Sequence, residues 1–489
     1  MAHPLFVADD KKHLILSDGE KRQRAGKERD GMSLLSKIAI GNVRRNLNDF
    51  GVYFAALAAG ACLMYSYAAS GDYLFKLVTD ESVRGLFVAE ANYSLAFGIL
   101  PLLVFLNVAS YANKFLIRRR LPEFALYELA GLEKRNVTSV LRLETAIVAG
   151  SGLAAGLILG VLISPFVEMI VAWAYRLPVR FVMVFSPLGT AVTIVVFVLT
   201  ILVLSRGSRR VLRKSTLLRM MSAKKESDSS KPISVGRAIV DLIFGVALVS
   251  VVYVVCANVP VAFLGLMIPL GACAIFGSFF IFRATLVLLP RLIKHIPGVW
   301  YRGLTAFTVR QTEGVARNAS KAMTCSAALS SVGMCMFVFA VVLHDQIGAM
   351  AFEGGVQTDD IPGIFGALIF TCAFYAVVLL VFASVILAIQ QLSLAADNRE
   401  RYHKLVELGA SPQMLSKSLL MGVLFNFILP GIFTVIHAIF GLNVIRFMGY
   451  EMFQADIEPA IWPVAALTLA GFVVYFLITY AGAKRNALA

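Results

Sequence analysis

Ten long apolar stretches, separated by polar segments, dominate the chain. They lie at about 50–70, 94–117, 144–172, 188–205, 239–257, 261–282, 322–343, 363–389, 418–441 and 461–482. Each is close to the ~20 residues that an α-helix needs to cross the hydrocarbon layer of a membrane. The pattern predicts an all-α polytopic membrane protein with ten transmembrane helices. The fifth and sixth stretches are separated only by Asn258, Val259 and Pro260, so we expect a very tight turn there.

The polar segments on the two sides of the predicted membrane differ in charge. Only five of the 45 Lys and Arg residues fall in the loops assigned to one side, whereas eleven of the 30 acidic residues do. Cytoplasmic loops of membrane proteins carry an excess of Lys and Arg. The net charge of +15 is therefore explained by topology rather than by nucleic-acid binding. We expect a bacterial cytoplasmic membrane protein with both termini in the cytoplasm.

One cytoplasmic connection, 114–131, has a clear helical pattern of its own. It opens on basic residues, and after Pro122 its apolar positions recur at near-helical spacing up to Gly131. Pro favours the first turn of a helix, and Gly supplies the positive φ that commonly ends one. We therefore expect a short separate helix between the second and third spans. Such a helix either docks a soluble partner or rests on lipid headgroups.

A second copy of this connection lies near the other end of the chain. Residues 399–410 again follow one span and precede another, and 126–129 superposes on 405–408 at an offset of 279. Ser411 and Pro412 then predict the N-cap and first turn of the next helix. Two such helices in equivalent places favour docking of two equivalent partners.

The repeat extends beyond these connections. The segment 42–45 before the first span corresponds to 308–311 before the seventh, and each is followed by two spans, a connection helix and two more spans. We divide the chain into a polar N-terminal tail (1–31), a first four-span unit (32–205), a basic cytoplasmic linker (206–237), a two-span insert (238–290) and a second four-span unit (291–489). The tail has no apolar core, so we do not expect it to be a signal peptide.

The first unit resembles the FtsX/MacB-like permease domain of ABC transporters. The resemblance rests on a basic amphipathic entry segment, an Arg-rich end of the second span, the sequence of 123–132 and a Gly-rich third span. The ten-span arrangement with two such units is similar to the bacitracin-resistance (BceB-type) branch. Relatives in that branch carry a large extracellular domain between spans seven and eight, and this chain has only 344–361 in that place. The resemblance is weaker in the second unit, where 399–401 replaces the contiguous Arg triplet.

The resemblance implies a separate nucleotide-binding ATPase at each connection helix. The chain has no G-x-x-x-x-G-K-[ST] motif, so we expect it to bind no cofactor, with ATP and Mg held by two copies of a partner ATPase. A sensor kinase or a second permease subunit is a further candidate partner, besides the lipid bilayer. The residues assigned to ATPase coupling are Glu123, Phe124, Tyr127, Glu128 and Leu129 in the first copy and Tyr402, Leu405, Glu407 and Leu408 in the second.

Two other sets of residues stand out in the spans. Gly152, Gly156 and Gly160 recur every four residues, which is typical of close helix approach. We place lateral access for a substrate near this stripe, between the two units. Glu168 and His437 are polar residues at membrane depth and are candidates for the substrate path. We expect no metal site, because no ligand cluster has a recognisable spacing.

Three functions remain open at this stage. The first is the permease subunit of an ABC transporter of the mechanotransmission type, which exports or releases an amphiphilic or lipophilic substrate such as an antimicrobial peptide. The second is a signalling module that relays ATPase motion to a sensor kinase or cell-wall enzyme without transport. The third is an ion-coupled carrier, which ranks last because we find no pair of spans with matched charges near the midplane.

Overall fold

The computed structural model describes residues 35–45, 47–70, 72, 99–175, 181, 183, 185–214, 233–353 and 361–488. The N-terminal tail, most of the basic linker and much of the loops 71–93 and 344–362 lie outside the described residues. Within the described ranges every regular element is a helix. The all-α fold predicted from the sequence is therefore confirmed.

The described residues form the following helices, in chain order. Residues 35–45 are helical, and the later helices are α2 (Leu47–Ala68), α5 (Ile99–Leu129), α6 (Lys134–Ala174), α7 (Pro187–Lys214), α9 (Val235–Asn258), α10 (Pro260–Gly265), α11 (Met267–Lys294), α12 (Pro297–Trp300), α13 (Thr305–Glu353), α14 (Ile361–Asp397), α15 (Arg399–Glu407), α16 (Pro412–Phe453) and α17 (Glu458–Leu488).

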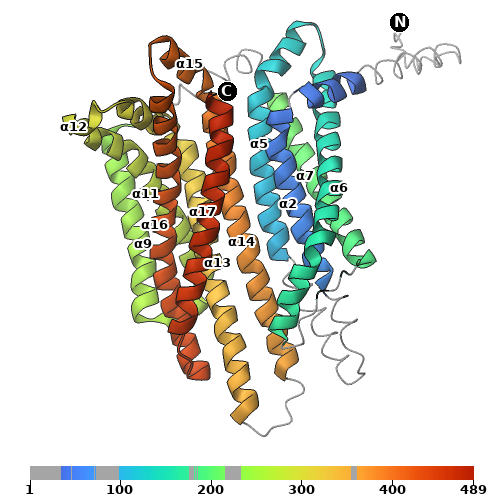
Figure 1. Cartoon of the computed structure of the whole chain (residues 1–489), viewed down its shortest axis with the longest axis vertical. Coiled ribbons are helices and arrows are strands. Elements are labelled where there is room, and N and C mark those ends of the chain that lie inside the picture. The colour runs from blue at the N-terminus through green and yellow to red at the C-terminus, as the bar shows by residue number, and fades with distance from the viewer. Residues whose placement is uncertain are drawn as a thin grey trace, which may run out of the picture.

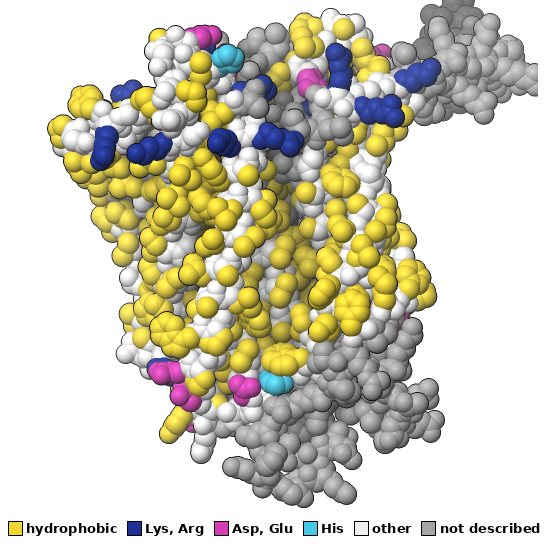
Figure 2. All heavy atoms as spheres, viewed as in Figure 1, with side chains coloured by type: hydrophobic (Ala, Val, Ile, Leu, Met, Phe, Trp, Pro, Cys, Tyr) yellow, Lys and Arg dark blue, Asp and Glu magenta, His cyan; other side chains and the backbone are white. Residues whose placement is uncertain are grey.

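The long helices have the length and composition of membrane spans. In the part of the chain that the structure describes, eight helices are long and apolar enough to cross a membrane, and Tyr53–Ala68 is a shorter apolar helix. The helix α5 occupies the place of the second expected span, while the count of ten stays a prediction. Figure 2 shows apolar side chains over the middle of the face in view, with Lys and Arg gathered at one end, hereafter the basic end. The chain is a multi-pass membrane protein.

The turn between the fifth and sixth spans differs from the prediction. After α9 ends at Asn258, Pro260 starts the six-residue helix α10, and Leu266 separates it from α11. The sixth long helix therefore begins at Met267 rather than at 261. Pro is favoured at the first position of a helix, so it starts a new short helix here instead of closing a tight turn.

The helices form two groups joined along α14. The helices α2, α5, α6 and α7 contact one another, while α9 and α11 form a hairpin that packs on α13 and α16. The helix α14 contacts α13, α16 and α17 on one side and α2, α5 and α6 on the other. Figure 1 shows the two groups side by side, with α14 between them.

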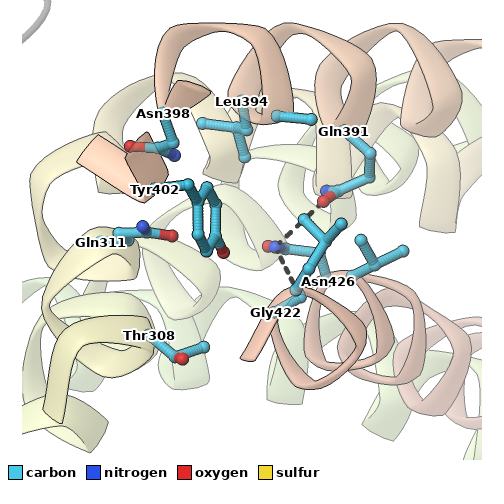
Figure 3. A pocket seen from close by; sticks show the side chains of 11 residues that line it. Thr308, Gln311, Gln391, Leu394, Asn398, Tyr402, Gly422 and Asn426 are labelled. Carbon is cyan, nitrogen blue, oxygen red and sulfur yellow. Dashed lines mark hydrogen bonds between the residues drawn. The ribbon is translucent and has the colours of Figure 1, made fainter. Parts of the chain in front are cut away.

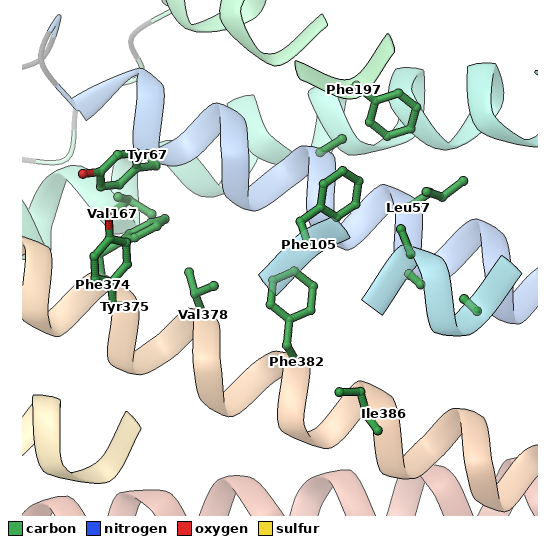
Figure 4. Packing of buried hydrophobic residues seen from close by; sticks show 14 of the residues in the cluster. Leu57, Tyr67, Phe105, Val167, Phe197, Phe374, Tyr375, Val378, Phe382 and Ile386 are labelled. Carbon is green, nitrogen blue, oxygen red and sulfur yellow. The ribbon is translucent and has the colours of Figure 1, made fainter. Parts of the chain in front are cut away.

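The contact between the groups is a continuous apolar core (Figure 4). The ring of Tyr67 on α2 lies 5.0 Å from Phe374 and 5.8 Å from Tyr375 on α14, between ring centroids. Nearer the basic end, Phe382 of α14 and Phe105 of α5 belong to the same buried cluster. Burial of aromatic side chains contributes strongly to packing, so α14 is firmly attached to both groups.

The glycine stripe of the third span lies inside the first group. A Cβ atom at Gly156 would be 2.5 Å from the Ala58 oxygen and 2.6 Å from the Ala61 Cβ, and Gly152 and Gly160 also face α2. These glycines therefore allow α6 to approach α2 within one unit. The stripe therefore does not lie at the contact between the units, which is made by α14, and the lateral access route stays a prediction.

Two pairs of opposite charges between helices were missed in the sequence. The Arg283 side chain of α11 donates to both carboxylate oxygens of Asp241 on α9, at 2.8 and 2.5 Å. The second pair joins Arg120 of α5 to Glu144 of α6. Asp241 lies in the second turn of α9 and was counted as part of an apolar stretch. Pairing explains how such charges are retained in long apolar helices.

Candidate coupling site

Two segments at the basic end of the bundle finish with the same local structure. In the first, Gly131 has a φ of +92°, and the amides of Gly131 and Leu132 donate to the carbonyls of Glu128 and Tyr127. In the second, Gly409 has a φ of +90°, with the corresponding bonds to Val406 and Leu405. This is the Schellman arrangement, which uses Gly because its left-handed conformation is unfavourable for other residues. We call residues 120–133 the first tip and 398–411 the second tip.

The shared caps set the register of the repeat. Gly409 follows Gly131 by 278 positions, and the N-cap Ser411 follows the N-cap Glu133 by the same number. The offset of 279 taken from the sequence is therefore wrong by one residue. In the corrected register Phe124 corresponds to Tyr402, and both side chains are buried. The caps decide the register because the positive φ and the hydrogen bonds of each cap occur at one position only. The apolar pattern, in contrast, matches nearly as well one residue away.

The two tips differ in how they join the preceding span. The helix α5 runs without interruption from Ile99 to Leu129 and contains Pro122, so the first tip is the end of the span rather than a separate helix. The second tip contains the separate helix α15, as predicted, after a break at Asn398. The predicted N-cap at Ser411 is also confirmed, since its hydroxyl accepts from the Met414 amide at 3.3 Å.

A buried ionic network holds the first tip. Arg120 is fully buried, and its guanidinium donates to the Glu144 carboxylate, which is buried as well. Arg120 also donates to Glu123 at 2.9 Å. The Asn42 amide, on the helix before α2, donates to the second Glu144 oxygen at 2.7 Å and to the Tyr127 hydroxyl at 3.0 Å. The network thus ties the entry helix, the tip and α6 together.

The Arg120 guanidinium is enclosed by rings as well as by carboxylates. Its central carbon lies 5.1 Å from the Phe50 ring centroid and 5.3 Å from that of Phe124. Cation–π contacts of this kind gain strength where water is excluded. Arg120 is the third residue of the Arg triplet that was interpreted from the sequence as a marker of cytoplasmic topology. One member of that triplet is therefore a structural centre of the first tip.

The residues assigned to coupling divide into supporting and exposed groups. Phe124 and Tyr402 are buried and support the two tips from inside, and their assignment to ATPase coupling stays a prediction. Glu123 and Tyr127 face the network, and Glu128 and Leu405 are half-buried. Leu129 is 55% exposed, Leu408 is 83% exposed and Glu407 is exposed. Two further exposed apolar residues, Leu126 and Val406, were not singled out in the sequence.

The second tip rests on Tyr402. Its ring lies 5.4 Å from that of Phe307 on α13, in an edge-to-face arrangement. Burial raises the pKa of the Tyr402 phenol, while hydrogen bonds with Ser418 and Gln311 lower it in part. The phenol therefore stays neutral at physiological pH and joins α15 to α13 and α16.

The two candidates for a substrate path lie in different groups of helices. His437 on α16 is bonded at both ring nitrogens, to the Tyr253 hydroxyl at 2.7 Å and the Ser278 hydroxyl at 2.8 Å. It therefore links α16 to the α9–α11 hairpin. Glu168 on α6 is buried at the end of the first group opposite the basic end, within electrostatic range of Tyr65. The structure does not bring Glu168 and His437 together.

Three residues of the ionic network that holds the first tip were missed in the sequence, and each carried a weak signal. Glu144 is a charge at the start of an apolar stretch, Arg120 belongs to a run of three arginines, and Asn42 lies in an amphipathic segment. Only their meeting in space shows their role. Among the described residues no group of three His, Cys, Asp or Glu side chains could hold a metal ion.

Comparison with known proteins agrees with this geometry. Residues 93–213, which include the first tip, match the FtsX-like permease C-terminal family. The bacitracin export permease protein BceB of Halalkalibacterium halodurans is 23% identical over 269 residues, covering 53% of this chain and 40% of that protein. The uncharacterized ABC transporter permease YvcS of Bacillus subtilis is 23% identical over 276 residues, covering 55% and 41%.

The BceB protein of Bacillus subtilis is 20% identical over 273 residues, covering 54% of this chain and 41% of that protein. The matched region of this chain thus spans about two fifths of the length of each relative. The chain carries an FtsX-like permease domain and is a homologue of the BceB-type permeases of ABC transporters.

Proposed function

We propose that this chain is the transmembrane subunit of a bacterial ABC transporter of the mechanotransmission type. Each of the two tips binds one copy of a separate ATPase subunit on the cytoplasmic side. Closure of the two ATPases moves the tips, and the long helices transmit this motion across the membrane. The chain itself binds no nucleotide, and ATP and Mg are held by the partner.

One observation carries this proposal: both tips present exposed apolar side chains at the basic end of the bundle. Leu126 and Leu129 are 62% and 55% exposed, and Val406 and Leu408 are 50% and 83% exposed. The helix α15 and the segment that joins α5 to α6 lie at the end of the bundle where Lys and Arg gather (Figures 1 and 2). Apolar side chains at such a place are typical of surfaces that bind another protein.

The same tip geometry also supports a partner present in two copies. The two Schellman caps and the two buried aromatics, Phe124 and Tyr402, occupy equivalent positions in the repeat. A symmetric pair of ATPases therefore meets two similarly shaped surfaces. The excess of Lys and Arg at this end favours its placement in the cytoplasm.

For the substrate we propose an amphiphilic or lipophilic molecule, such as an antimicrobial peptide. Two of the relatives are named as bacitracin export permeases. The apolar surface of the spans also suits a substrate that reaches the protein from the membrane. ATP hydrolysis by the purified complex is then stimulated by membrane-partitioned peptides and not by a hydrophilic solute.

The proposal is tested by placing charges on the exposed tips. The double variant Leu129→Asp/Leu408→Asp should lose the co-purifying ATPase, because each change puts a carboxylate in an apolar contact. Tyr301→Asp is the matched control, since Tyr301 is also exposed, at 81%, and follows α12 at the same end. Retention of the ATPase by the double variant would contradict docking at the tips.

A further inference from the structure

The second tip contains a small polar cavity beneath α15. It has a volume of ≈ 30 Å³, and its lining includes Gln311 of α13, Gln391 of α14, Tyr402 of α15 and Asn426 of α16. Figure 3 shows these side chains around a common space. No Lys, Arg, Asp or Glu is part of the lining.

One buried amide nitrogen of this lining lacks a hydrogen-bond partner among the described residues. Gln391 is 3% exposed, and its Nε2 has no partner, although its Oε1 accepts from Asn426 at 3.4 Å. Buried polar groups in proteins are nearly always hydrogen-bonded, to protein or to ordered water. The cavity offers room for about two water molecules, each of which needs only ~10–15 Å³ of such space.

The cavity of the second tip occupies the position that corresponds, in the repeat, to the ion pair of the first tip. Arg120 precedes Gly131 by eleven residues, and Asn398 precedes Gly409 by the same number. Glu144 follows the N-cap Glu133 by eleven residues, and Gly422 follows Ser411 in the same way. Asn398 and Gly422 both line the cavity. The pair of charges in one repeat is thus replaced by an amide and a glycine in the other.

Gly422 leaves space for a side chain. A Cβ atom there would have its nearest contact at 3.6 Å, with the Thr308 side chain, which is an ordinary van der Waals distance. The chain also breaks at Asn398, between α14 and α15, whereas α5 is continuous through Arg120. The first tip is therefore fixed to α6 by a buried ion pair. The corresponding positions of the second tip hold no ion pair, and the Asn398 side chain accepts from Arg401 of its own tip, at 3.3 Å.

We propose that the second tip holds ordered water in place of the ion pair of the first tip, and that this hydrated junction lets α15 tilt relative to the spans. The water accepts a hydrogen bond from Gln391 Nε2 and lies among α13, α14 and α16, which line the cavity. Because water molecules exchange partners readily, the junction deforms more easily than an Arg–carboxylate pair. The two tips then respond unequally to any force applied at the basic end. This inference does not depend on the identity of the partner.

The direct test is an experimental structure of the chain in a lipid nanodisc, at a resolution that shows water. Ordered water should lie within hydrogen-bond distance of Gln391 Nε2. A dry cavity, or one closed by inward movement of the glutamines, would overturn the hydration claim.

The mechanical claim is tested by moving the ion pair between repeats. In Asn398→Arg/Gly422→Glu, amide hydrogen exchange over 399–407 should slow by roughly tenfold, because opening of α15 now breaks a buried pair. The control Gly422→Ala adds only the Cβ and should leave exchange over 399–407 unchanged. An unchanged rate in the folded double variant would overturn the proposal.

A second double variant, which removes the ion pair from the first tip, covers the case in which Asn398→Arg/Gly422→Glu does not fold. Arg120→Asn/Glu144→Gly should accelerate exchange over 121–129 and leave 399–407 as in the natural chain. If exchange over 121–129 does not change, the ion pair does not fix the first tip, and the difference between the two tips is refuted.

Discussion

At the residue scale, the first tip depends on one buried pair of charges. Arg120 and Glu144 have fully buried side chains and satisfy each other, with further support from Glu123 and Asn42. Two buried charges cost desolvation energy, and their mutual attraction offsets this cost only when the geometry is good. The pair therefore adds specificity to the position of the tip more than it adds net stability.

The single variant Glu144→Gln should lower the stability of the chain. It leaves the Arg120 charge buried without its partner, and removing one member of a buried pair costs ~3–5 kcal/mol. Thermal unfolding in detergent should show a clear fall in the midpoint. The double variant Arg120→Met/Glu144→Leu should recover most of this loss, since it leaves no buried charge.

A half-exposed pair in the same chain is the control for this prediction. Arg291 and Glu313 lie 3.1 Å apart, with side chains 35% and 30% exposed. Glu313→Gln should change stability by less than ~1 kcal/mol, because solvent screens the interaction. Equal losses for Glu144→Gln and Glu313→Gln would show that burial of Arg120 is unimportant.

At the element scale, α6 and α2 approach each other through small residues. Gly156 faces the backbone of Ala58 so closely that even a Cβ atom would displace it. Helices in membranes associate through packing rather than through a hydrophobic driving force, so close approach is the main source of their attraction.

Gly156→Leu should therefore destabilise the first unit. The side chain forces α6 away from α2, and overpacking of this kind costs ~1–3 kcal/mol or more. Gly150→Leu on the same helix is the control, because no atom lies within 4 Å of a Cβ there. Unfolding midpoints of the two variants should differ clearly, and equal midpoints would contradict the packing described for the stripe.

The helices were predicted well from sequence, because long apolar stretches have few alternatives in a membrane. The Gly131 cap and the Ser411 N-cap were also predictable, since each depends on local chemistry. Two features failed for a common reason. The continuity of α5 through Pro122 and the start of α11 at Met267 depend on which of several tolerable backbone paths the neighbouring helices stabilise.

The site could be predicted only in part for a similar reason. The sequence located both tips, but it could not separate the buried Phe124 and Tyr402 from the exposed Leu129 and Leu408. All four are apolar or aromatic residues in short helical patterns, and their burial is decided by distant partners such as Phe307. The pairing of Arg120 with Glu144 depends in the same way on the contact of α5 with α6.

At the scale of the whole molecule, the account depends on the orientation in the membrane. Cysteines replacing Leu126 and Lys404, which are exposed at the two tips, should resist an impermeant thiol reagent in intact cells. A cysteine replacing Glu458, exposed at the opposite end, should react. The six native cysteines are removed first. Labelling at Leu126→Cys from outside would reverse the orientation.

The division into two similar four-span units stays a prediction, and the matching caps at Gly131 and Gly409 support it. The apolar core of the molecule runs without a break from α2 and α5 through α14 to α13, so motion at one tip reaches the other unit through packed side chains. This arrangement suits a single chain that receives force from two partners at once.

The most direct test of the central claim is the mass of the complex purified from cells with its ATPase. If each tip binds one ATPase subunit, native mass spectrometry should show two ATPase subunits for each copy of this chain. A complex with one ATPase per chain, or a chain that purifies alone under conditions that preserve related transporters, would contradict the account.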